Sequence, residues 1–84
     1  MQIYLIIASD NNYSKTPIRS YLNKENAFNS VRQLTFNYLE YDAYNALNMV
    51  KSFDLEVTQE NIERYMDFDI TYHIQELEIE DFNL

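Results

Sequence analysis

The sequence predicts a single α+β domain over residues 1–84, in which a three-stranded antiparallel sheet of strand order 2-1-3 carries two to three helices between its second and third strands. Three observations predict this fold. An apolar, β-branched segment opens the chain, and a shorter alternating segment follows it after a polar loop. Apolar residues then recur at helical spacing between residues 24 and 67. Alternation returns over residues 70–75, and no Gly/Ser-rich linker or repeat divides the chain.

The first strand is predicted over residues 1–8 and should be central, because it is apolar on both of its faces. One face carries Ile3, Leu5 and Ile7, and the other carries Tyr4, Ile6 and Ala8. Such a strand is covered on both sides, or it uses one face for association. Residues 9–16 are polar and should form a loop. Residues 17–22 read as an outer strand with Pro at its first position, where a missing N–H is tolerated.

The helical part begins at Asn23, a predicted N-cap. A first helix over residues 24–38 should bury a stripe formed by Ala27, Phe28, Val31, Leu34 and Tyr38. The same period continues through Ala43, Leu47, Val50 and Phe53, as a second helix or as the first one bent near Glu40. Thr58 is the other predicted cap, and Val57 and Ile62 around it have hydrophobic-staple spacing. A short helix over residues 59–67 should follow.

The last strand changes phase along its length. Ile70, Tyr72 and Ile74 are even-numbered, whereas Leu77 and Ile79 are odd-numbered. A β-bulge near Gln75-Glu76 is the predicted cause, because it inserts one extra residue. The chain also has no glycine, so turns that need a positive φ should use asparagine, and Asn11-Asn12 is the clearest candidate.

Charge is the most informative feature for function, because the acidic residues are strongly one-sided. Residues 1–35 hold two acids against four bases, a net of +2, while residues 36–84 hold twelve acids against two bases, a net of −10. Such a field repels nucleic acid and anionic membranes and attracts a basic groove. We therefore expect neither direct nucleic-acid binding nor membrane binding. The absence of cysteine is typical of a protein in a reducing cytoplasm.

The predicted partner-binding residues are mostly carboxylates. Glu76, Glu78 and Glu80, with Asp81 beside them, share one face of the last strand and form an anionic row. The alternative is a solvent face whose charges discourage aggregation of an edge strand. Further acids that would extend this surface are Glu60, Glu63, Asp67 and Asp69.

Tyr41 and Tyr44 are candidate interface anchors, since tyrosine supplies contact area at low entropy cost; equally, they could fill a small core. His73, the one histidine, has no evident partners for metal binding or catalysis. No nucleophile motif, phosphate-binding glycine loop or spaced metal-ligand series is present, so we expect no enzyme activity, no cofactor and no metal.

Several segments resemble small acidic proteins of phages and mobile elements. They are the strand Ile3–Ala8, the Tyr21-Leu-Asn-Lys-Glu-Asn-Ala27 segment at a helix start, and the Ile74-Gln-Glu-Leu-Glu-Ile-Glu80 strand. The resemblance covers about half of the chain, and residues 41–68 look like an insertion. Some acidic proteins of this size, among them anti-CRISPR and anti-restriction proteins, occupy the nucleic-acid groove of a nuclease.

The resemblance carries over no active residue, but it implies a function. The leading hypothesis is an inhibitor of a host defence nuclease that acts in the host cytoplasm as a nucleic-acid mimic. The alternative is a non-enzymatic homodimer that assembles through its sheet, with an acidic surface that serves solubility.

Overall fold

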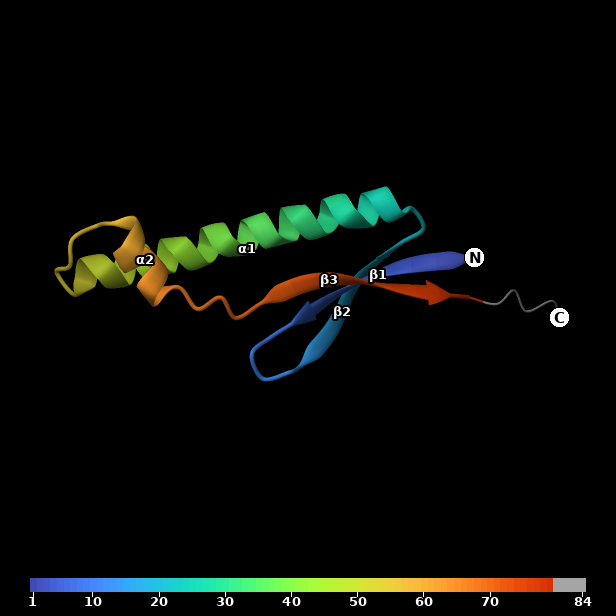
Figure 1. The fold of residues 1–84 in the computed structure, drawn as a ribbon, viewed down its shortest axis with the longest axis horizontal. Coiled ribbons are helices and arrows are strands. Elements are labelled where there is room, and N and C mark those ends of the chain that lie inside the picture. Colours follow the sequence, from blue (N-terminus) through green and yellow to red (C-terminus); the bar gives the residue numbers. More distant parts are fainter. Residues whose placement is uncertain (80–84) are drawn as a thin grey trace. The chain divides into compact units, whose positions relative to one another are not determined.

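The computed structural model describes residues 1–79. Five elements follow one another (Figure 1): β1 (Gln2–Ser9), β2 (Lys15–Tyr21), α1 (Lys24–Ser52), α2 (Gln59–Tyr65) and β3 (Thr71–Glu78). The strands form one antiparallel sheet of order β2-β1-β3. The predicted fold class is therefore confirmed, with two helices between the second and third strands.

The chain divides into two compact units. One, the sheet unit, comprises Met1–Thr35 together with residues 69–79, and the other, the helical unit, comprises Phe36–Phe68. The helix α1 contributes its first turns to the sheet unit and its remaining turns to the helical unit. The sequence predicts that both units belong to a single domain, and this stays a prediction.

The outer strand β2 begins two residues earlier than predicted and contains the irregularity of the sheet. Ile6 pairs with Arg19 and Ile7 pairs with Pro17, so Ile18 is the extra residue of a bulge. Proline has no N–H to donate and is confined to edge strands and bulges, and Pro17 occupies both settings.

Strand β3 pairs with β1 without any shift, from Gln2 opposite Glu78 to Ser9 opposite Thr71. The predicted bulge near Gln75-Glu76 is therefore wrong. The phase change has another cause, because both faces of this sheet accept apolar side chains. Leu77 lies opposite Ile3 on one face, while Ile74 lies opposite Ile6 on the other.

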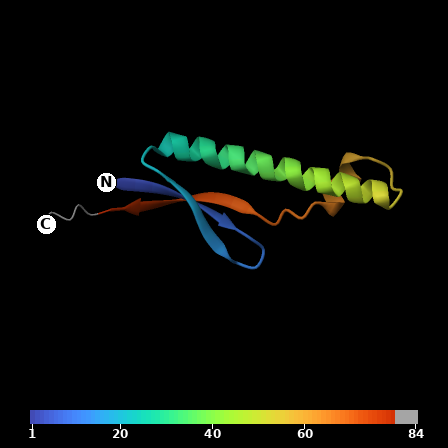
Figure 2. The same ribbon diagram turned by 180° about the vertical axis from the view of Figure 1, so that it is seen from behind.

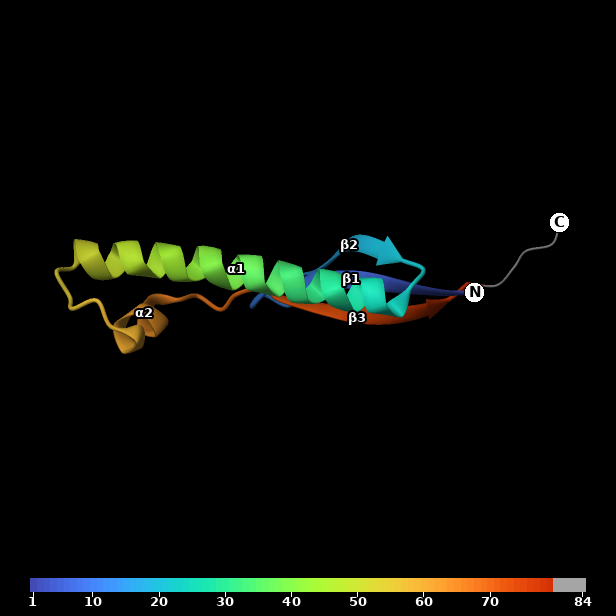
Figure 3. The ribbon, with the colours of Figure 1, turned by 90° about the horizontal axis from the view of Figure 1, so that it is seen from above.

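The first turns of α1 cover one face of the sheet (Figure 3). Tyr21 Oη on this face donates a hydrogen bond to Ser30 Oγ of the helix at 3.0 Å. Ile6 of β1 and Ala27 of α1 are both completely buried. The opposite face carries Ile3, Leu5, Ile7 and Leu77, and no helix of the described sheet unit packs on it.

Helix α1 is continuous over Lys24–Ser52, where the sequence was compatible with either one bent helix or two helices. Asn23 caps it as predicted, since its Oδ1 accepts from the N–H of Glu25 at 2.8 Å and from that of Asn26 at 3.2 Å. Phe28 was expected in the buried stripe but is 57% exposed. Each residue turns a helix by about 100°, so Phe28 points away from the buried side chain of Ala27.

The glycine-free chain uses other residues where φ is positive. Within residues 1–79 these are Tyr13, Asp54 and Phe68, with φ of 64°, 54° and 47°. The prediction that Asn11-Asn12 takes the positive φ is wrong, because Tyr13 takes it in that turn. The side chain of Asp10 organises the turn. Its Oδ1 accepts from the N–H of Asn12 at 2.9 Å and from that of Ser14 at 3.0 Å.

Asp54 ends α1 in the position usually taken by glycine. Its N–H donates to the Lys51 carbonyl at 3.1 Å, and the N–H of Leu55 donates to the Val50 carbonyl at 3.0 Å. These two bonds define a Schellman motif, which satisfies carbonyls that the helix end would otherwise leave unpaired.

Helix α2 lies beside the last turns of α1 in the helical unit (Figures 1 and 2). Its predicted cap is confirmed, since Thr58 Oγ1 accepts from the N–H of Asn61 at 3.1 Å. The rings of Phe53 and Tyr65 meet in a tilted arrangement with centroids 5.6 Å apart. These contacts fix the short helix, which has too few turns to be stable alone.

A buried carboxylate joins α1 to the segment after α2. Asp42 is only 4% exposed; its Oδ1 accepts from the N–H of Asp67, and its Oδ2 accepts from the N–H of Phe68, each at 2.9 Å. Two donors compensate part of the cost of taking a charge out of water. Ala46 and Val50 follow Asp42 at four-residue intervals and are also buried.

We predict that Asp42→Ala lowers the free energy of unfolding by about 2–4 kcal/mol, because two backbone N–H groups lose the buried carboxylate that accepts from them. Asp42→Asn should also destabilise, since its NH₂ group would face a donor. Urea unfolding, followed by circular dichroism and tyrosine fluorescence, measures the change. Glu40→Gln, an exposed neighbour, is the control and should shift it by less than about 0.5 kcal/mol. Equal stability of Asp42→Asn and the native chain would contradict the assignment.

Candidate protein-binding surface

Negative charge is concentrated in the helical unit. Residues 36–68 hold seven carboxylates against the two basic side chains of Lys51 and Arg64, a formal −5. The described part of the sheet unit holds five carboxylates against four basic side chains, a formal −1. Of the formal −10 that residues 36–84 carry, half therefore lies in the helical unit.

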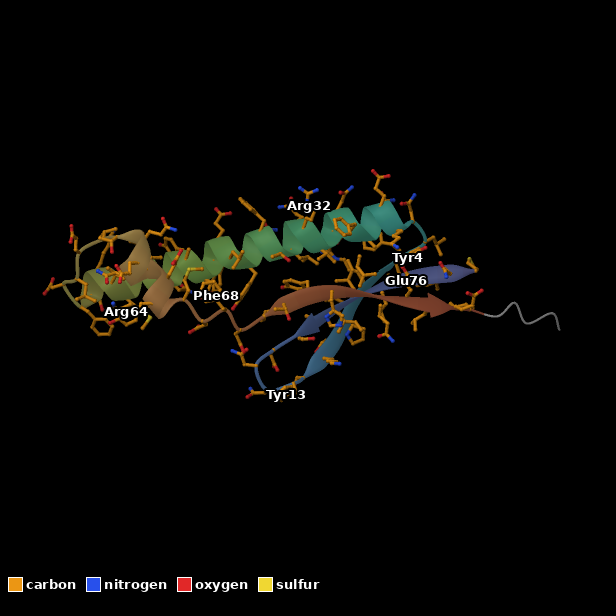
Figure 4. The ribbon with its side chains drawn as sticks, viewed as in Figure 1. Tyr4, Tyr13, Arg32, Arg64, Phe68 and Glu76 are labelled. Atoms are coloured by element: carbon orange, nitrogen blue, oxygen red, sulfur yellow. The ribbon has the colours of Figure 1, made fainter. Side chains whose placement is uncertain are left out.

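The predicted carboxylate row on β3 lies partly beside positive groups. Glu76 is opposite Tyr4 on the face that α1 covers (Figure 4), and its Oε1 is 3.1 Å from Lys24 Nζ. Glu78 Oε1 is 3.8 Å from the amino terminus. Glu80 and Asp81, the other members of the row, lie outside the described residues. Positive groups therefore neutralise part of the charge of Glu76 and Glu78, which are less anionic than the predicted row of free carboxylates.

The ion pair changes the titration of its lysine. A hydrogen bond from the ammonium group to Glu76, together with the negative charge of that carboxylate, raises the pKa of Lys24 above its ordinary value of 10.5. Both side chains are largely exposed, so solvent screens the pair and its effect on stability is small.

The flanking acids are divided between the two units. Glu60 and Glu63 lie on α2, where Glu60 Oε1 is 3.8 Å from Arg64 Nη2 and Glu63 Oε1 accepts from Gln59 Nε2 at 3.0 Å. Asp67 lies near the end of the same unit and is exposed. Asp69 belongs to the sheet unit, where its Oδ1 accepts from the N–H of Asn11 at 3.0 Å.

Tyr41 and Tyr44 are exposed, at 65% and 63%, so the alternative that they fill the core is wrong. With Asn37 and Glu40 they line a shallow hollow of about 440 Å³. The four residues follow the helical i, i+3, i+4, i+7 spacing, which places them on one face of α1. Two aromatic rings beside a carboxylate suit a cationic side chain, and an arginine guanidinium can use both kinds of group.

Asp42 is the residue of this region that the sequence did not single out. Its burial and its two backbone donors distinguish it from the exposed acids around it. The only sequence signal is its position, because Asp42, Ala46 and Val50 lie on one helix face and the latter two are apolar. A carboxylate in such a stripe is most simply explained by a buried hydrogen-bonding role.

Within residues 1–79, no three His, Cys, Asp or Glu side chains come together to hold a metal ion. His73 is exposed on β3, opposite Ile7 of β1. No helix in this part of the chain is long and apolar enough to cross a membrane.

Comparison with protein-family models, with curated proteins and with solved structures found no match to this chain.

We predict that Glu76→Gln lowers the pKa of Lys24 toward 10.5, because it removes the negative charge and replaces the charged hydrogen-bond acceptor with a weaker, neutral one. A pKa raised by folding stabilises the protein below the unfolded value, and this contribution disappears as pH rises through the folded value. The pH range over which this stabilising contribution is lost therefore lies above 10.5. NMR titration of the Lys24 side chain measures the shift, and Glu78→Gln on the same strand is the control. An unchanged Lys24 pKa in Glu76→Gln would refute the assignment.

Proposed function

We propose that the protein is a non-enzymatic inhibitor from a phage or mobile element. It binds the basic, nucleic-acid-binding surface of a host defence nuclease in the host cytoplasm and acts as a nucleic-acid mimic, as an anti-CRISPR protein does. The origin and the target class come from the resemblance of the sequence to small acidic proteins of phages. The observation that carries the binding mode is the hollow on α1, which Tyr41, Tyr44 and Glu40 line together in the helical unit.

The physical basis of the proposal is complementarity of charge. A groove that binds nucleic acid presents Lys and Arg side chains toward phosphates. The helical unit offers exposed carboxylates to the same side chains, and the hollow offers one of them an aromatic contact as well. Aromatic residues at the centre of an interface contribute most of its binding energy, whereas the surrounding charges mainly accelerate encounter.

The test is affinity capture from a bacterial lysate at low salt, followed by elution with a salt gradient. We predict recovery of a nucleic-acid-binding protein that added nucleic acid displaces. Its association rate should fall between low and physiological ionic strength, because salt screens the attraction. A double variant, Glu40→Gln with Tyr44→Ala, should weaken binding by at least about tenfold.

Glu25→Gln is the matched control, because it removes one exposed charge from the sheet unit. It should leave the affinity within about threefold of the native value. A captured partner whose association rate ignores salt, or whose affinity is the same for the control and the double variant, would contradict the mimic mechanism.

A second candidate function, homodimer assembly, is favoured by the face of the sheet opposite α1. Ile3, Leu5 and Leu77 form an apolar surface there beside the buried Ile7, and Leu77 is 38% exposed. Ile79 continues that face by strand alternation and is 41% exposed. In this function the acidic residues keep the assembled protein soluble.

If the sheet face forms a dimer, Leu77→Lys should abolish it, because a charge would be buried within the apolar interface. Leu22→Lys is the control, since Leu22 is exposed outside the sheet. Analytical ultracentrifugation at tens of micromolar protein gives the mass of each variant. A monomeric mass for the native chain would exclude assembly through this face.

A further inference from the structure

Within residues 1–79 the sheet has two edges, β2 and β3, and they differ in how they discourage a further strand. Strand β2 carries Pro17 and the bulged Ile18, two devices that discourage the addition of a further strand. Strand β3 is the other edge. It keeps a regular register over Thr71–Glu78 and contains no proline. A regular edge of this length can accept an extended segment of another chain.

The register shows which backbone groups of β3 face outward. The N–H of Ile79 donates to the Met1 carbonyl at 2.8 Å, so these two residues form a hydrogen-bonded pair with β1. Hydrogen-bonded pairs alternate along an antiparallel ladder. The odd-numbered residues of β3 therefore bond to β1. The outward N–H and C=O groups, which have no backbone partner within residues 1–79, belong to Tyr72, Ile74, Glu76 and Glu78.

The outward-facing positions define a chemical pattern. Their side chains share one face of the sheet; Tyr72 and Ile74 are apolar in character, and Glu76 and Glu78 are acidic. Glu76 and Glu78 remain 46% and 70% exposed despite their ion pairs, so an added strand can reach both carboxylates. A strand running antiparallel to β3 would meet Glu78 first and Tyr72 last.

We propose that the edge of β3 binds an extended basic segment of a partner protein as a fourth, antiparallel strand. The segment places Lys or Arg beside Glu78 and Glu76, and β-branched or aromatic residues beside Ile74 and Tyr72. A second copy of this chain fits less well, because each copy carries −8 and β3 has no Lys or Arg. The inference rests on the proposed function in one respect, since both require a basic partner.

The probe is a synthetic peptide, Lys-Thr-Arg-Thr-Val-Thr-Tyr-Thr, titrated into the full chain at low salt. We predict that amide hydrogen exchange at Ile74 and Glu76 slows by at least about tenfold, because the peptide covers these outward N–H groups. The matched control is the same peptide N-methylated at Arg and Val, which keeps its charge but loses two donors. It should bind at least about tenfold more weakly.

Two substitutions at one position test the same edge from the protein side. Glu76→Pro removes an outward N–H without removing a bond to β1, and it should weaken peptide binding by about tenfold or more. Glu76→Gln keeps the N–H and should weaken binding by about threefold, with a smaller salt dependence. If Glu76→Pro does not fold, the N-methylated peptide decides the question.

Equal binding of the N-methylated peptide, or exchange protection only away from Ile74 and Glu76, would overturn the proposal. Protection of these two amides that rises with protein concentration in the absence of peptide would assign the edge to a second copy and would overturn it as well. The Glu40→Gln, Tyr44→Ala double variant should bind the peptide like the native chain. The edge and the hollow on α1 can therefore fail independently.

Discussion

The helical unit depends on one buried carboxylate. Asp42 accepts a hydrogen bond from each of two successive backbone N–H groups, at Asp67 and Phe68, and so fixes the chain as it leaves α2. The same contact holds Phe68 at a φ of 47°, a conformation that costs a residue other than glycine about 1–2 kcal/mol. A short helix with few apolar contacts would otherwise have little to hold it against α1.

The two units differ in how far their negative charges are balanced by positive ones. The sheet unit nearly balances its signs and pairs Glu76 with Lys24, so its carboxylates are partly compensated. The helical unit buries one acid and leaves most of the others exposed beside few cations. Exposed like charges oppose compaction, and natural domains retain them where solubility or a partner requires it. We infer that the helical unit is shaped by binding more than by stability.

The sequence predicted the elements that have strong local signals. The central strand β1, the caps Asn23 and Thr58, and the strand order followed from residue types and spacing. The predictions that were wrong or missing concern features that are decided by tertiary contacts. Nothing local indicated that the extra residue lies at Ile18 rather than in β3, because a sheet apolar on both faces tolerates either phase. The sequence also could not separate Asp42 from its exposed neighbours, since its donors lie 25 and 26 residues away.

The most direct test of the central claim, that the helical unit is the charge-based binding surface, is an NMR map of contact with a basic ligand. A short oligoarginine peptide would be titrated into isotope-labelled protein at low ionic strength. The account predicts that the largest amide shift changes occur at Asn37, Tyr41 and Tyr44 and along α2. Changes confined to the β1–β2 hairpin, or of equal size in both units, would contradict it.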